Sequence, residues 1–193
     1  MVNHSLSLMD ESTQIVKLNV KDLMRHEEVS QPRLNALARK IEEDGMQRRP
    51  VVVHRVGEGF LMLDGHHRAG ALEKLGYPSI LATEIGFYLT DFVSVRSWRS
   101  NGFYDKTTII QRALDGDLYP PHTTRHVVSF DGGQWKSFHH NDVLEPERNI
   151  SLKKLERPCK TPAPPTQLIG TQGTLFVFMP VVPPPVSPIY SST

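Results

Sequence analysis

The chain has 193 residues, of which 38% are hydrophobic and 22% charged, and this length and composition predict one soluble domain with a sizeable core. The formal net charge of +1 gives no electrostatic reason to expect nucleic acid or an anionic membrane as a partner, and the one cysteine, Cys159, excludes an internal disulfide framework and cysteine-based zinc sites. Residues 1–10 lack a secretory signal pattern and no run approaches the ~18 apolar residues that span a bilayer, so we expect a cytoplasmic protein.

A strand and a helix are predicted in the first part of the chain. Residues 15–20 alternate between polar and apolar side chains, as a half-buried strand does. A helix is expected to begin at Ser30, which can cap it, with Pro32 in its first turn. The apolar residues that follow repeat at helical spacing as far as Gly45, which supplies the stop.

A hairpin and a second helix follow. Residues 50–55 and 60–63 are apolar runs on either side of a glycine turn at residues 57–59, which is typical of a hairpin. The second run leads directly into a helix that we expect from near His66 to Gly76.

The second half of the chain continues the alternation. Residues 79–85, 92–95 and 127–130 indicate strands, and residues 107–114 indicate a short amphipathic helix. Because short helices alternate with strands and hairpins, the sequence predicts an α+β domain with a mixed sheet.

The composition changes near Pro158. Nine of the 15 prolines lie between Pro158 and Thr193, which favours an extended, mobile segment. We therefore predict a domain at residues 1–157 and a proline-rich tail at residues 158–193. Within the tail, only residues 173–179 have the composition of an edge strand.

The junction between the second hairpin strand and its helix carries the residues Asp64-Gly65-His66-His67-Arg68. A glycine there permits a sharp turn and close approach of a ligand, and the first amides of the helix point outward without intrahelical acceptors. The helix dipole and the histidine and arginine donors add to this, so the segment predicts a phosphate site. Asp64 would be repelled by an anion unless a cation lay between them, which points to Mg²⁺.

Two other interpretations of this junction are open. Asp64 could simply cap the helix while the histidines lie on the surface. A metal held by both histidines is disfavoured, because adjacent helical residues point about 100° apart.

Four motifs follow one another along residues 15–135. They are the pair His26-Glu27, residues 63–68 followed by 71–76, Trp98, and Thr123-Thr124-Arg125-His126. In this order, the motifs resemble the free L-serine kinases of the ParB/sulfiredoxin fold, a family with an archaeal enzyme and bacterial relatives from siderophore clusters. That family has a tryptophan at the position of Trp98 and Lys-Thr-Thr-Arg-His at the last motif.

The resemblance implies transfer of a phosphoryl group from ATP or ADP to the hydroxyl of free L-serine, giving O-phospho-L-serine. Such a reaction depends on positioning and charge neutralisation more than on covalent chemistry. Glu27 would be the general base, although an acid at a helix entrance is more often a surface residue and Glu28 is an adjacent competitor; Asp64 would be catalytic and hold Mg²⁺. The residues implied in phosphate binding are Gly65, His66, His67, Arg68, Thr123, Thr124 and Arg125, and those implied in binding serine are Trp98 and His126.

The sequence departs from the family in two places. His122 replaces the lysine that precedes Thr-Thr-Arg-His, which removes a fixed positive charge, and the connection from Trp98 to Thr123 is much shorter than in the archaeal enzyme. Sulfiredoxin chemistry requires a cysteine where this chain has a histidine, and between Phe130 and the proline-rich tail there is no room for the helix-turn-helix DNA domain of ParB proteins. The alternatives left open are a ParB-like nucleotide-binding regulator without kinase activity and a kinase for another small alcohol. The choice between ATP and ADP and the oligomeric state are also open, and no function is assigned to His139 or His140.

Overall fold

A mixed five-stranded sheet organises the computed structural model, which describes residues 13–130, 134–139 and 142–159. Residues 13–19 and 79–85 form an antiparallel pair of strands at one edge, and the predicted hairpin of residues 51–64 is also antiparallel. The strand at residues 79–85 pairs in parallel with the first strand of the hairpin. A short parallel strand completes the other edge. The strands in spatial order are β1 (Thr13–Asn19), β6 (Ser79–Ile85), β4 (Val51–Val56), β5 (Gly59–Asp64) and β2 (Leu23–Met24).

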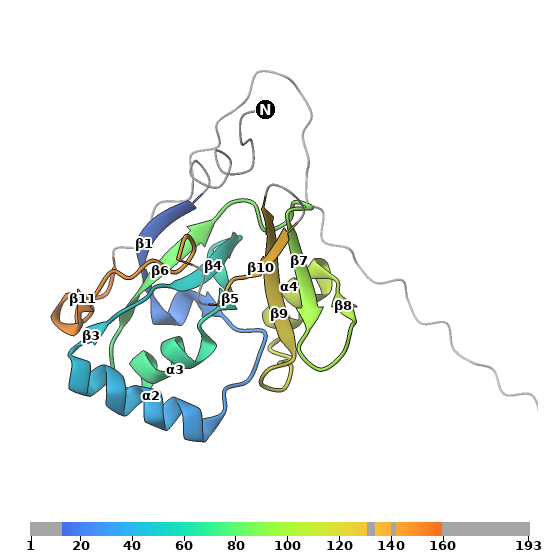
Figure 1. Cartoon of the computed structure of the whole chain (residues 1–193). Coiled ribbons are helices and arrows are strands. Elements are labelled where there is room, and N and C mark those ends of the chain that lie inside the picture. Colours follow the sequence, from blue (N-terminus) through green and yellow to red (C-terminus); the bar gives the residue numbers. More distant parts are fainter. Residues whose placement is uncertain (1–12, 131–133, 140–141, 160–193) are drawn as a thin grey trace, which may run out of the picture. The chain divides into compact units, whose positions relative to one another are not determined.

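A second, four-stranded sheet is antiparallel throughout and lies beside the first (Figure 1). A separate two-stranded ladder is antiparallel as well. The second sheet has the order β10 (Gln134–Ser137), β9 (Thr124–Phe130), β7 (Val93–Ser97) and β8 (Phe103–Tyr104), and the ladder joins β11 (Ile150–Ser151) to β3 (Met46–Gln47).

In the described part of the chain, three α-helices pack on these sheets: α2 (Gln31–Asp44), α3 (His66–Lys74) and α4 (Lys106–Asp115). Figure 1 shows α2 and α3 side by side on one face of the five-stranded sheet. Gly45 ends α2 in the left-handed conformation, as predicted. The expected side-chain cap at Ser30 was wrong: Ser30 stands at the N-cap, but its hydroxyl makes no capping bond, and its amide donates to His67 instead.

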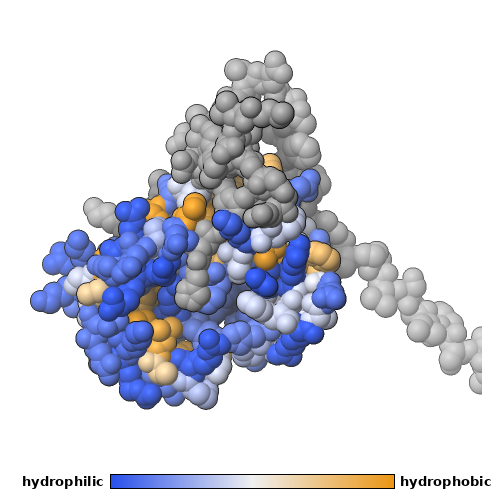
Figure 2. All heavy atoms as spheres, in the orientation of Figure 1, coloured by the Kyte–Doolittle hydropathy of each residue, from blue (hydrophilic) through white to orange (hydrophobic). Residues whose placement is uncertain are grey.

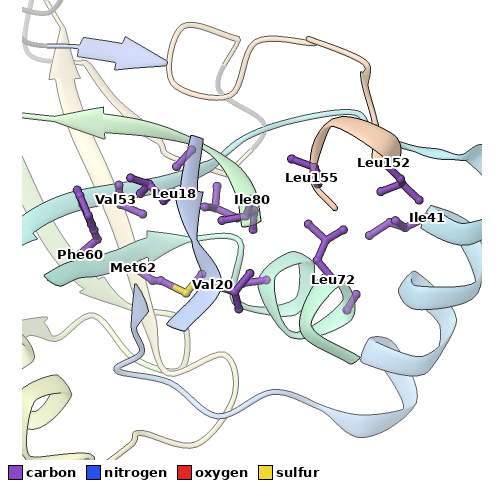
Figure 3. Packing of buried hydrophobic residues seen from close by; sticks show 14 of the residues in the cluster. Leu18, Val20, Ile41, Val53, Phe60, Met62, Leu72, Ile80, Leu152 and Leu155 are labelled. Carbon is purple, nitrogen blue, oxygen red and sulfur yellow. The ribbon is translucent and has the colours of Figure 1, made fainter. Parts of the chain in front are cut away.

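The central strands β4 and β5 contain uninterrupted apolar runs because their side chains alternate between two covered faces of the sheet. Because successive side chains of a strand point to opposite faces, a sheet that is covered on both sides needs apolar residues at every position. One face packs against α2 and α3 (Figure 3), and the other packs against the second sheet and α4. The first face receives Val51, Val53, Phe60 and Met62, and the second receives Val52, Leu61 and Leu63.

The last described segment, residues 142–159, contributes to the hydrophobic cluster between the five-stranded sheet and the helices α2 and α3. Leu152, at the start of the 3-10 helix η2 (Leu152–Lys154), is buried with Leu155 near α2 and α3 (Figure 3). Cys159 donates its amide to Asn19 Oδ1 at 2.7 Å. The predicted domain boundary stays a prediction, and the predicted strand at residues 173–179 lies outside the described residues.

The described elements confirm the prediction of an α+β fold with a mixed sheet and short helices. Polar side chains cover most of the face in Figure 2, and apolar side chains form small separate patches there. Among the described residues, no helix combines the length and apolar character that crossing a bilayer requires.

Candidate active site

Glu27 is held between two segments that lie far apart in the sequence. The amide of Glu28 donates to the Tyr119 carbonyl at 2.8 Å, and the Tyr119 amide donates to the His26 carbonyl at 2.8 Å. This pairing brings the start of β9 beside Glu27, whose carboxylate accepts hydrogen bonds from both the amide and the hydroxyl of Thr124. Glu27 is only 8% exposed, while Glu28, the alternative base, is exposed.

The surroundings of Glu27 make its carboxylate more basic than usual. Burial raises its pKa, and the donors of Thr124 and the His122 amide offset only part of that effect. His122 has φ 57°, a left-handed conformation that is uncommon for a residue other than glycine and that clusters at functional sites. A buried carboxylate with a raised pKa is suited to accept a proton near neutral pH.

Three histidines form a buried cluster next to Glu27. The His26 ring meets the rings of His66 and His126 edge to face, with centroids 4.6 and 5.2 Å away. Burial lowers the pKa of His26 to about 4 and the pKa values of His66 and His126 well below their usual range. The three rings are therefore neutral at pH 7, so the His66 side chain, predicted as a phosphate ligand, brings no positive charge.

Residues 64–68, which we call the anion turn, have the backbone shape that the sequence predicted. Gly65 has φ 93°, and an added Cβ would lie 2.6 Å from Val51 Cγ1, so only glycine fits. The N-cap of α3 is Gly65 and no side chain caps the helix, so Asp64 does not serve as the cap. The first backbone bond into the helix runs from the Ala69 amide to the Gly65 carbonyl at 3.0 Å. The three preceding amides therefore lie at the helix N-terminus without intrahelical acceptors.

The acidic end of the anion turn is neutralised by Arg68. Arg68 Nη2 lies 3.3 Å from Asp64 Oδ2 and also forms an ion pair with Glu145, which is fully buried. His139 Nδ1 lies 3.5 Å from Asp64 Oδ2. Burial raises the pKa of Glu145 and its hydrogen bond with Asp64 adds to this. For Asp64, hydrogen bonds from His139 and Glu145 and the Arg68 charge outweigh burial and lower the pKa.

These groups also form the candidate metal site of the described residues. One donor atom each from Asp64, His139 and Glu145 lie within 4.8 Å of one another. Carboxylate oxygens suit Mg²⁺, whereas an imidazole nitrogen suits transition metals better. Two of the three donors thus fit the predicted Mg²⁺, and Arg68 is the cation that a metal would have to displace or share with.

The remaining predicted residues lie around the ends of β7 and β9. The Arg125 guanidinium stacks over the Trp98 ring at 4.7 Å, and Trp98 is 47% exposed. The Trp98 amide donates to the Thr123 carbonyl at 3.1 Å, while the Thr123 hydroxyl donates to the Pro120 carbonyl at 2.7 Å. The Thr123 hydroxyl thus stabilises the turn that precedes β9.

Further basic side chains lie beside the anion turn. His67 Nε2 accepts from the Ser30 amide at 3.1 Å, and the His67 ring centroid is 6.0 Å from that of His122. Arg33, in the first turn of α2, donates to His122 Nε2. Arg33 places a fixed positive charge next to His122.

The sequence motifs did not indicate three residues of this site: Arg33, His139 and Glu145. Each contacts its partner across a long stretch of chain, for example 77 residues between Arg68 and Glu145. No motif contains them, and only a general enrichment of histidine and acids at residues 139–147 could have drawn attention to the last two.

No family model matches the sequence. Two curated proteins are similar to parts of it. The ATP-dependent L-serine kinase of Staphylothermus marinus is 34% identical over 85 residues, which are 43% of this chain and 33% of that protein. The ATP-dependent L-serine kinase of Desulfurococcus mucosus is 31% identical over 100 residues, which are 51% of this chain and 39% of that protein. The chain thus matches only about a third of the length of these relatives.

Among solved structures, a free serine kinase in complex with AMP has a similar fold. The TM-score is 0.60 and the match covers 75% of this chain and 94% of that chain, with 16% sequence identity. SbnI from Staphylococcus aureus, with a C-terminal truncation, matches with a TM-score of 0.56 and 14% identity over 79% of this chain and 92% of that chain. The fold expected from the resemblance is therefore the fold observed.

Proposed function

We propose that this protein transfers the terminal phosphoryl group of ATP or ADP to the hydroxyl of free L-serine. The observation that carries the proposal is Glu27, a buried carboxylate with a raised pKa that is held by Thr124. Its chain neighbour His26 contacts His66 of the anion turn. The names of both curated relatives support a kinase for serine with ATP, and the AMP in the free serine kinase structure supports a nucleotide ligand. These similarities favour the kinase over a ParB-like regulator.

Glu27 is the proposed general base. Its carboxylate takes the proton of the serine hydroxyl as the serine oxygen bonds to the terminal phosphorus. The bond from that phosphorus to the bridging oxygen breaks, so ATP leaves as ADP, or ADP leaves as AMP. General base catalysis of this kind contributes about 10²–10⁴-fold to rate.

The anion turn is the proposed phosphate cradle. The amides of His66, His67 and Arg68 and the dipole of α3 would face the phosphate oxygens. Arg125 would contribute its guanidinium from the opposite side of the site, while Thr123 and Thr124 would act mainly through the turn and through Glu27.

Trp98 and His126 are the proposed serine contacts. Trp98 is exposed and stacked on Arg125, so it can close over a small ligand. His126 is buried and neutral, so it would offer a hydrogen bond and no charge. We also propose a cytoplasmic location, with free serine as the partner.

Asp64 and Glu145 are the residues that would hold Mg²⁺, with His139 beside them. When bound, the ion would neutralise the charge of the phosphate oxygens. Arg68 would then form an ion pair with a carboxylate oxygen of Asp64 or Glu145 that does not bind the ion.

One assay tests the proposal. Purified protein is incubated with Mg²⁺, ATP or ADP, and serine or threonine, and the amino acid product is identified by mass spectrometry. We expect O-phospho-L-serine. Nucleotide binding without any phosphorylated amino acid would refute the kinase proposal and support the ParB-like alternative.

A further inference from the structure

We infer that His26 is a positioning residue that sets the direction of the Thr124 hydroxyl and, through it, the orientation and basicity of Glu27. The inference rests on the proposed function, since it concerns the proposed base. His26 directly precedes Glu27 in the chain, but its side chain contacts Thr124 and not the carboxylate next to it. His26 Nε2 lies 2.9 Å from Thr124 Oγ1, and both groups are buried.

The hydrogen atoms available to Thr124 define the role of each partner. A threonine hydroxyl donates one proton, and an ionised carboxylate only accepts. When Glu27 is ionised, the Thr124 hydroxyl donates to Glu27 Oε1, and its contact with His26 Nε2 is then one in which the hydroxyl accepts. This assignment places the ring proton of His26 on Nε2, and the donation runs in one direction, from His26 through Thr124 to Glu27.

The buried environment of His26 maintains this arrangement. Its side chain is fully buried, and the rings of His66 and His126 contact it edge to face, which restricts rotation. Burial keeps the imidazole neutral at pH 7, with a pKa of about 4. A neutral donor polarises the Thr124 hydroxyl without placing a second charge beside Glu27.

This arrangement determines which carboxylate oxygen of Glu27 can accept a proton. Both Thr124 donors hold Oε1, so an incoming proton would be accepted on Oε2. These two bonds, together with the His122 amide, favour the ionised carboxylate and oppose the effect of burial, which raises the pKa of Glu27. The other titratable or charged groups near this chain of bonds are His122, His66, His126, Asp64 and Arg25.

The kinetic test compares pH profiles of kcat/KM. His26→Leu and Thr124→Val should move the acid limb upward by about one pH unit, a tenfold change in the ionised fraction of Glu27 at a given acid pH. His26→Gln should retain the original limb, because its amide nitrogen can take the place of Nε2. His54→Leu is the control, since it removes a half-buried histidine whose Nδ1 lies 3.0 Å from the Ile85 carbonyl. It should not move the limb.

A second readout does not require kinase activity. The apparent pKa of Glu27 is followed by ¹³C NMR in glutamate-labelled protein without substrates, and its signal is assigned with Glu27→Gln. The apparent pKa should rise in His26→Leu and Thr124→Val and stay unchanged in His26→Gln. If His26→Leu fails to fold, His26→Asn replaces it, because the shorter amide does not reach Thr124 Oγ1.

The outcomes separate the inference from the proposed function. An unchanged Glu27 pKa in His26→Leu, together with a shift in Thr124→Val, would overturn the inference even if the protein makes phosphoserine. Lower activity of His26→Leu with an unshifted pH profile would overturn it as well, because a structural role predicts that result. If the NMR shifts occur in a protein that makes no phosphoserine, the hydrogen-bond chain stands and the kinase proposal fails.

Discussion

The anion turn consists of five consecutive residues, whereas Glu27 depends on Thr124, which lies 97 residues later in the chain. The turn takes its shape from Gly65 and from the start of α3, so its backbone donors are defined locally. Glu27 acquires its raised pKa only when two distant segments pair and exclude water around it. Substitutions that loosen tertiary packing should therefore change the position and pKa of Glu27 more than they change the backbone conformation of the anion turn.

The largest expected effect is on the assembled part of the site. Glu27→Gln keeps the shape of the side chain but cannot accept a proton, so kcat for phosphoserine formation should fall by about 10²–10⁴-fold. Nucleotide affinity, measured by calorimetry, should change little, because the anion turn is intact. The matched control is Glu28→Gln at the exposed neighbouring position, which should retain activity. Equal losses in both variants would contradict the assignment of Glu27.

A second prediction concerns the bond between the anion turn and the distant segment at residues 142–159. Glu145→Ala removes a buried partner of Arg68 and should lower the free energy of unfolding by about 3 kcal/mol. Asp142→Asn breaks the pair with Arg49, but Asp142 is 87% exposed, so this control should cost less than about 1 kcal/mol. Urea denaturation measures both. Similar values for the two variants would mean that Arg68 does not depend on Glu145.

Acid should destabilise the buried cluster of His26, His66 and His126. The pKa of His26 is lower in the folded state than the usual 6.5, so its contribution to stability is present above pH 6.5 and is lost as the pH falls towards 4. For His26 alone, the loss is about 3 kcal/mol. His66 and His126 shift in the same direction and add to it. Urea unfolding at pH 7 and pH 4.5 tests this, and His26→Gln should show the smaller difference.

The last prediction concerns the local part of the site, where the measured quantity is the difference between two glycine variants. Gly65→Ala must adopt φ 93° and place a Cβ against Val51, which together should cost about 2–4 kcal/mol. Gly76→Ala has a similar φ of 80° but meets no atom within 4 Å, so it should cost only about 1–2 kcal/mol. Thermal unfolding measures the loss of stability in both variants, and the difference between the two losses is the cost of the contact between the added Cβ and Val51. If nucleotide binding is weaker in Gly65→Ala but not in Gly76→Ala, the backbone conformation at Gly65 is required for phosphate binding.

The sequence predicted the local features well because they depend on neighbouring residues. The hairpin of β4 and β5, the helix that begins at His66 and the glycine stop at Gly45 all follow from spacing within a few residues. The two-residue strands β2, β3, β8 and β11 were missed, since two residues carry no periodicity.

The candidate site divides in the same way. The motifs indicated the anion turn and, by resemblance, Glu27 and Thr124. They could not indicate that the His66 ring lies inside the protein, because helical position alone does not say which face is covered. Nor could they indicate that His139 and Glu145 meet Asp64, since contacts across such distances depend on the complete fold.

The pairing of Glu27 with Thr124 also determines when the site can first form during synthesis. At about 5–20 residues per second, Thr124 is added to the growing chain about 5–20 seconds after Glu27. Until then the anion turn has no neighbouring base, and Arg68 lacks Glu145 for longer still. A nascent chain that ends before Thr124 therefore lacks the hydrogen bonds that hold Glu27. Under the proposed function, the protein becomes catalytically active only after β9 has docked.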